Sequence, residues 1–269
     1  MTTAVPTLDE LGRDLLRVHP CRLAISVLMP FVIALAYIGF ACAELWAPAV
    51  LCVGVLSFVT YGSISHDLVH RTYGLPRHLN DWLLTAIELL MLRSGRAYRL
   101  AHLNHHARYP SPDEDPEAIA AHGTFWQAIR SGPLFFLRLW WWAVRKHPSH
   151  RLRLIAEGCV VVLLAVAAIG AATLRWSLVP LVYACLAYLG TWIVPLVTAY
   201  FPHQPKGVTP LGQTRRFRGW VSRLIAFDHL YHLEHHLFPA VPHQRWPELA
   251  TRLDPYLDHA GVPALTIGI

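Results

Sequence analysis

The residues APAVLCVGVLSFVTYGSIS at 47–65 run directly into HDLVH at 66–70. The first part is apolar and long enough to cross the hydrocarbon core of a bilayer, which takes about 20 residues. The second part places His66 and His70 four residues apart, so on a helix both imidazoles lie on one face. This junction predicts a membrane-spanning helix that ends in a pair of potential metal ligands.

Three further apolar stretches have a similar length, so the four predicted spans are 23–43, 47–65, 154–174 and 178–200. The whole chain is 54% hydrophobic and only 15% charged, whereas soluble proteins are roughly 45–50% apolar and about 25% charged. We therefore predict an all-α integral membrane protein with four transmembrane helices in two hairpins.

The basic residues indicate how these hairpins are oriented. Of the 23 lysines and arginines, only Arg175 falls in a loop on the side opposite to the termini. Because cytoplasmic loops of membrane proteins carry the excess of basic residues, the N- and C-termini are predicted to be cytoplasmic. Segments 66–153 and 201–269 then form a cytoplasmic helical cap, and residues 1–269 form a single membrane domain.

Three segments of this cap have helical patterns of their own. The apolar run 82–92 is too short to span a bilayer and predicts a dipping or interfacial helix. Segment 124–146 mixes aromatic with basic residues, which is typical of a helix in the headgroup plane. Segment 247–259 predicts a helix in the C-terminal part of the cap.

Histidine clusters are the strongest functional signal in the chain. The pattern HxxHH occurs twice, as HLNHH at 102–106 and HLEHH at 232–236. Such spacings place the imidazoles on one face of a helix. A zinc ion takes about three or four protein ligands, so eight histidines suit two metal ions better than one. Together with HDLVH, the predicted ligands are His66, His70, His102, His105, His106, His232, His235 and His236.

The ligand type constrains the chemistry but leaves the metal open, because imidazole suits zinc, copper, iron and nickel. Hydrolytic two-metal sites typically use bridging carboxylates, whereas histidines in apolar surroundings favour redox chemistry. Two iron ions (Fe²⁺/Fe³⁺) in such a site could use O₂ as co-substrate to attack a C–H bond of a lipophilic molecule. The chain has no CxxCH, CxxC or GxGxxG motif, so electrons are expected from a separate ferredoxin or cytochrome.

Carboxylates near the clusters are candidates to accept the second N–H of a ligating imidazole. Asp228 lies four residues before His232 and would share its helix face. Asp67 and Glu234 lie inside clusters but point away from the ligand face, so they would support histidines of another cluster. Asp113 and Asp115 follow the second cluster and are further candidates.

Nine histidines lie outside the three clusters. His229 lies three residues before His232 and could add to its helix face, and His203 follows the fourth span within FPHQP. As lone histidines, both are more often capping or surface residues than ligands. The other seven have no partner at a useful spacing and are expected at solvent or interface positions: His19, His78, His122, His147, His150, His243 and His259.

Several other classes of protein fit poorly. The net charge of +6 is explained by a basic membrane face that contacts anionic lipids or an acidic redox partner. No feature of so apolar a chain supports nucleic-acid binding. Ion transporters usually carry ionisable residues near mid-membrane, and the four predicted spans have almost none. The five cysteines show no metal-binding spacing and are expected to be packing residues.

At these motifs the chain resembles the membrane fatty acid desaturase and hydroxylase superfamily. The resemblance covers both hairpins, the three histidine boxes in order and HHLFPAVP at 235–242. It implies four membrane helices and a non-haem di-iron centre on the cytoplasmic side. It also implies a ninth ligand between the fourth span and the last box, for which His203 is a better match than His229.

Within the superfamily, three motifs are similar to those of carotenoid ring hydroxylases and ketolases: HDLVH at 66–70, the second box followed by DEDPE at 113–117, and FPHQP at 201–205. This resemblance implies hydroxylation of the β-ionone ring of a carotenoid at C3. The alternatives are a carotenoid ketolase and a fatty acyl desaturase. Ketolases tend to have two tryptophans where this chain has PHQRW at 242–246, and the tail from Pro247 is similar to that of acyl desaturases.

Overall fold

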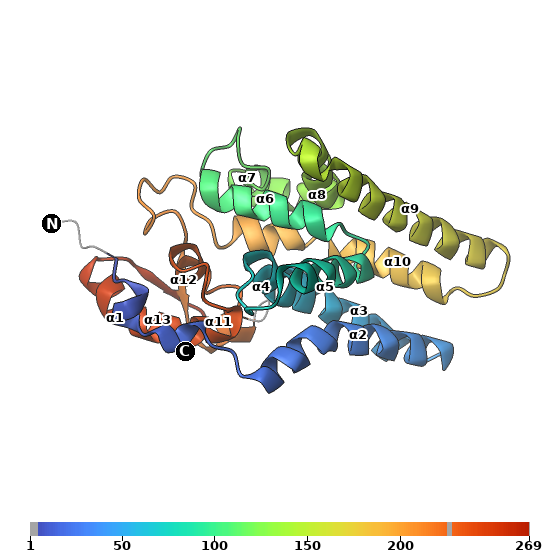
Figure 1. The fold of residues 1–269 in the computed structure, drawn as a ribbon, viewed down its shortest axis with the longest axis horizontal. Helices are drawn as coiled ribbons and strands as arrows, with labels where there is room; N and C mark the ends of the chain where they lie inside the picture. Colours follow the sequence, from blue (N-terminus) through green and yellow to red (C-terminus); the bar gives the residue numbers. More distant parts are fainter. Residues whose placement is uncertain (1–4, 225–227, 269) are drawn as a thin grey trace.

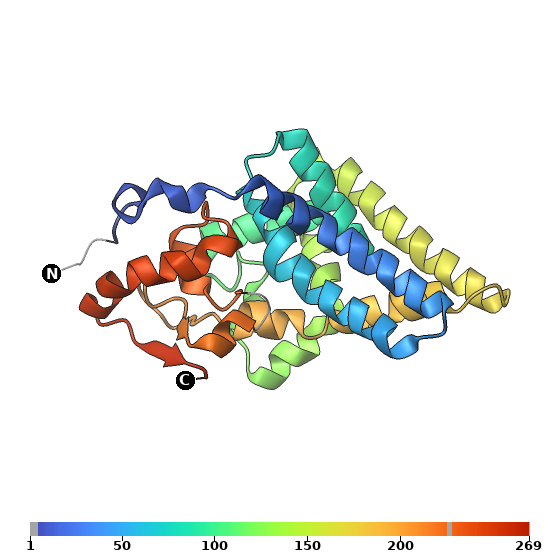
Figure 2. The same cartoon turned by 90° about the horizontal axis from the view of Figure 1, so that it is seen from below.

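The computed structural model describes residues 5–224 and 228–268. The described chain is mostly helical, and its long helices run side by side toward one end of the molecule (Figure 1). These are α2 (Pro20–Cys42), α3 (Trp46–Val59), α9 (Arg151–Thr173) and α10 (Val179–Gly190). Figures 1 and 2 both show the first and last helices of the chain, α1 (Leu8–Leu11) and α13 (Trp246–His259), at the opposite end.

The first hairpin confirms the junction predicted from the sequence. α2 begins at Pro20, where the missing N–H costs nothing because the first helical position has no intrahelical acceptor. α3 continues through a π-helical segment, η2 (Thr60–Ile64), into α4 (Ser65–His70). The apolar stretch and the HDLVH motif are therefore one continuous helix of 25 residues, Trp46–His70.

The second hairpin differs from the prediction in its return helix. Among the described residues, three helices are long and apolar enough to cross a membrane: Arg13–Cys42, Trp46–His70 and Pro148–Thr173. The stretch at 178–200 is not a single helix, because the 12-residue α10 is followed by a turn and a second π-helical segment, η4 (Leu196–Tyr200). Pro195 explains the break, since it has no N–H to bond the carbonyl of Thr191.

The segment between the hairpins supplies the helices that surround the second histidine cluster. The expected short helix at 82–92 is present as α5, and it starts earlier than expected. The aromatic and basic stretch forms α8, which begins with a capping box at Thr124. The elements of this segment are α5 (Arg77–Leu90), α6 (Gly95–Arg108), α7 (Ala118–Ala121), α8 (Phe125–Lys146) and η3 (Pro148–His150).

The C-terminal segment is helical except for one small sheet. The helix expected at 247–259 is present as α13. The all-α prediction is wrong for β1 (Arg216–Arg218) and β2 (Ala264–Thr266), which form a two-stranded parallel sheet. Arg216 and Arg218 bind Asp254 on α13, and this holds β1 beside the strand that follows that helix. The remaining elements are α11 (Trp220–Leu224), α12 (His232–Leu237), η5 (His243–Arg245) and, near the N-terminus, η1 (Arg13–Leu16).

Two apolar cores position the histidine clusters. One contains Leu68 of α4 and Ala101 of α6, so it holds the first two clusters together. The other contains Leu233 of α12 and Trp246 of α13, so it holds the third cluster. By contrast, outward-facing apolar residues such as Leu35 (66% exposed) and Leu163 (65% exposed) cover the long helices, as expected for helices that face lipid.

Candidate metal centre

Nine histidines converge into two groups in which the ring nitrogens lie within 4.8 Å of one another. Eight of them are the histidines predicted from the motifs, and the ninth is His203. Group one comprises His66, His70, His102, His106 and His235, and group two comprises His105, His203, His232 and His236. Eight predicted ligands would give four for each of two ions, whereas the two groups contain five and four histidines.

Helix geometry explains how each HxxHH motif serves both groups. On α6, His102 and His106 are separated by about one helical turn and point into group one. His105 points about 100° away from its neighbour His106, because each residue rotates the helix by that angle, and it enters group two. On α12 the roles are exchanged, since His232 and His236 enter group two and His235 enters group one.

The distances between nitrogens in group two are those of atoms that share a cation. The Nε2 atom of His203 lies 2.9 Å from that of His105 and 3.2 Å from those of His232 and His236. Two ligands at right angles, each about 2.1 Å from one metal ion, lie roughly 3 Å apart. A proton can lie between only one pair of these nitrogens at a time, whereas a metal ion satisfies all four lone pairs.

Group one has the same character. The Nε2 atom of His106 lies 3.2 Å from that of His102 and 2.7 Å from that of His235. His66 is 1% exposed, and neither of its ring nitrogens has a hydrogen-bond partner among the described residues. A buried unpaired polar group costs about 1–3 kcal/mol, and a metal ion in group one would remove that cost.

Burial favours the neutral, metal-binding form of these imidazoles, although at His105 the neighbouring Asp115 outweighs it and raises the pKa. Burial holds the pKa values of His102 and His106 well below the usual range, and the neighbouring imidazoles lower them further. The pKa values of His203, His232 and His236 are lowered in the same way. Neutral imidazole has a lone pair to donate, so the chemistry of the donor set fits two metal ions.

Acceptors behind the ligands fix the orientation of three rings. Asp115 accepts a hydrogen bond from Nδ1 of His105 at 2.7 Å, and Nδ1 of His203 donates to the carbonyl of Ala199 at 2.8 Å. A carboxylate oxygen of Glu117 lies 3.4 Å from Nδ1 of His102. Such acceptors leave Nε2 free to bind a metal.

Asp115 was one of two candidates in its loop, and the other, Asp113, is exposed. Glu117 was missed, although it belongs to the same DEDPE stretch. It is 15 residues from His102, and α6 ends at Arg108 between the two residues, so helix spacing cannot relate the two positions.

The three carboxylates predicted to support the ligands have other places in the structure. Asp67 accepts from the backbone N–H and from Nδ1 of His243, at 3.0 and 2.5 Å. Glu234 pairs with Arg218 at 2.6 Å. Asp228 has a φ of 68° and lies in a turn before α12. The prediction that it shares a helix face with His232 is therefore wrong, and its side chain lines a surface cavity of about 610 Å³.

Two side chains near the groups were not expected there. His243 was expected at a solvent or interface position, but it is buried against Asp67. Trp246 is fully buried, and its ring centroid lies 5.0 Å from that of His235 and 5.4 Å from that of His66. This indole therefore closes one side of group one and keeps water away from it.

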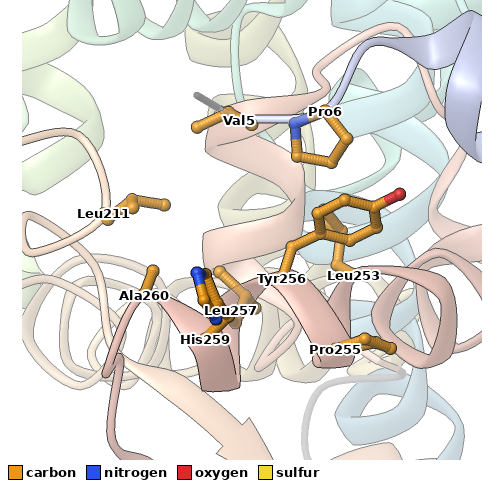
Figure 3. Close-up of a pocket in the computed structure, with 9 residues that line it drawn as sticks. All are labelled: Val5, Pro6, Leu211, Leu253, Pro255, Tyr256, Leu257, His259 and Ala260. Atoms are coloured by element: carbon orange, nitrogen blue, oxygen red, sulfur yellow. The ribbon is translucent and has the colours of Figure 1, made fainter. Parts of the chain in front are cut away.

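A second cavity lies apart from the metal groups. It has a volume of about 460 Å³ and lies between α13 and the chain just before α1. Figure 3 shows the ring of Tyr256 and the imidazole of His259 among aliphatic side chains there. None of the nine clustered histidines lines this cavity, so it is separate from the candidate metal centre.

Comparison with known families agrees with this geometry. The family model described as fatty acid desaturase matches residues 44–267, a range that contains both metal groups. The comparison with individual curated proteins finds no match.

Proposed function

Because this chain belongs to the fatty acid desaturase family, whose members are di-iron membrane oxidoreductases that use O₂, we propose a specific ligand set and a substrate class. Groups one and two each hold one iron ion. The observation that carries the proposal is the convergence of nine imidazoles from four separate parts of the chain. When bound, the iron pair would activate O₂ for attack on an unactivated C–H bond.

The residues of the chain have distinct parts in this proposal. The nine histidines bind the irons through the ring-nitrogen lone pairs of their neutral imidazoles. Asp115, Glu117 and the Ala199 carbonyl orient three of the rings, and Trp246 excludes water from group one. The centre lies where the helix Trp46–His70 ends, so a lipophilic substrate would reach it from the membrane.

The proposed substrate is a carotenoid, hydroxylated at C3 of its β-ionone ring. The motifs HDLVH, DEDPE and FPHQP support this choice, because they are similar to those of carotenoid ring hydroxylases. Fatty acyl desaturation is the second candidate, supported by the HHLFP stretch and by the description of the matching family. Ketolation of the same ring is the third.

The proposed topology has four spans, with the fourth made of α10, the turn after it and η4. In this arrangement the termini and the metal centre lie on the cytoplasmic side, where the basic residues gather. Electrons come from a separate ferredoxin or cytochrome, because the chain has no motif for an electron-carrying cofactor of its own. Nucleic acid has no part in the proposal.

Expression in cells that accumulate β-carotene tests the substrate. New zeaxanthin supports hydroxylation, new ketocarotenoids support a ketolase, and altered acyl unsaturation supports a desaturase. A His105→Ala variant, expressed to the same level, is the control for background activity. Iron analysis of the purified protein tests the centre, since the proposal requires two irons per chain and is refuted by zinc alone.

A further inference from the structure

The two π-helical segments occupy equivalent places in the two hairpins. η2 leads into the helix of His66, and η4 is followed closely by His203. In each segment the closing hydrogen bond spans five residues, from Ser65 N to Thr60 O and from Phe201 N to Leu196 O. π-Helical turns are rare and frequently lie at functional sites, so their placement here calls for a structural reason.

The backbone carbonyls of these segments accept hydrogen bonds from side chains at the centre. In η4, the Ala199 carbonyl accepts from the ligand His203. In η2, the Tyr61 carbonyl accepts from the hydroxyl of Tyr98 at 2.7 Å. The Gly62 carbonyl accepts from Nδ1 of His229 at 3.1 Å. Each carbonyl has two lone pairs, so it can accept a side chain in addition to a helix N–H.

His229 lies at the centre but, like His243, belongs to neither metal group. Its side chain is buried, and its ring centroid lies 4.8 Å from that of His232 in group two and 5.8 Å from that of His66 in group one. It precedes α12, which carries ligands for both groups. The bond to Gly62 therefore connects the third histidine cluster to the helix that carries the first.

Gly62 is suited to this contact because it has no side chain. A Cβ atom at this position would lie 3.3 Å from Nδ1 and 3.4 Å from Cγ of His229. That is tighter than ordinary van der Waals contact, so a methyl group would push the ring away from the carbonyl. Gly54 lies about two turns earlier in the same helix. A Cβ atom at that position would have nothing within 4 Å.

We infer that His229 is a positioning residue, whose Nδ1–H bond to the Gly62 carbonyl sets the place of α12 against α4 and so completes both metal groups. This inference rests on the proposed di-iron function. It assigns no metal-binding role to His229, and it gives Gly62 a role that the histidine motifs do not reveal.

Side chains that mimic one ring nitrogen at a time test the inference. The amide nitrogen of asparagine lies as far along the side chain as Nδ1 of histidine, and that of glutamine lies one bond farther, as Nε2 does. The variants are His229→Asn, His229→Gln and His229→Leu, with Gly62→Ala as the partner variant and Gly54→Ala as its matched control. Each full-length protein is titrated with Fe²⁺ without oxygen, and Mössbauer spectra of the ⁵⁷Fe-loaded protein report the ligand environment of each iron.

The expected result is a loss of about tenfold or more in Fe²⁺ affinity for His229→Leu, His229→Gln and Gly62→Ala, the lower end of what loss of an orienting partner typically causes. His229→Asn and Gly54→Ala should match the unsubstituted protein in affinity and in spectrum. Retention by the glutamine variant but not by the asparagine variant would overturn the inference, because Nε2 would then be the important atom. Equal losses in all three His229 variants, or none in His229→Leu, would overturn it as well. If the unsubstituted protein binds no iron, the proposed function fails instead.

Discussion

Replacing Asp115 with asparagine should weaken metal binding in group two while leaving group one almost unchanged. Asp115 is buried, and its two carboxylate oxygens accept from Nδ1 of His105 at 2.7 Å and from the backbone N–H of Glu117 at 2.9 Å. An asparagine side chain has only one acceptor oxygen. One of these two donors must therefore lose its partner.

The size of the effect follows from the bond that is changed. A hydrogen bond to a charged group contributes about 1.5–3 kcal/mol, and a neutral one about 0.5–1.5 kcal/mol. The difference of about 1–1.5 kcal/mol corresponds to roughly a tenfold change in affinity. Because His105 belongs to group two, that loss should fall on one of the two irons.

An anaerobic titration with Fe²⁺ in competition with a chelator measures the two affinities separately. Asp113→Asn is the matched control, since Asp113 lies in the same loop but is exposed, and it should leave both affinities unchanged. The reasoning is refuted if Asp115→Asn binds two irons with unchanged affinity, or if both sites weaken by the same factor.

Three further predictions test other parts of the structure. His203→Ala should reduce bound iron to about one per chain, because group two loses one of its four histidines. The control His259→Ala, at an exposed position, should leave the iron content unchanged, and mass spectrometry measures both. Trp246→Ala should lower the free energy of unfolding by about 3–5 kcal/mol, since the side chain is fully buried. Trp82→Ala, at a 65% exposed position, should change the free energy of unfolding little, and denaturation in detergent measures both. Removing iron with a chelator should lower the melting temperature, because a ligand present at 100 times its Kd stabilises the folded state by about 2.7 kcal/mol. An unchanged melting temperature would contradict a contribution of the metal to stability.

Much of the centre was predictable because helix periodicity is a local property. The spacings within HDLVH and the two HxxHH motifs place histidines on helix faces whatever the rest of the fold does. The division of those histidines between two groups was not predictable. It depends on how α6 and α12 approach each other, so that His105 and His235 each point into the group opposite to that of their neighbours on the same helix.

Two of the wrong predictions share a physical cause, because each extended a helix beyond its actual end. Asp228 was placed on the face of His232, but α12 begins only at His232 and Asp228 has a left-handed backbone conformation. The fourth apolar stretch was treated as one helix, although Pro195 interrupts it. Composition predicts the apolar character of a segment, whereas caps, prolines and turns decide where a helix ends.

The order of the ligands along the chain has a consequence for biogenesis. Four of the five ligands of group one precede residue 107, whereas three of the four ligands of group two follow residue 200. A nascent chain that has emerged only through its first hairpin and α6 already holds most of the first site and a single residue of the second. Both candidate sites become complete only after α12 has been synthesised, so a chain that lacks this helix would lack His235 of group one and two of the four histidines of group two.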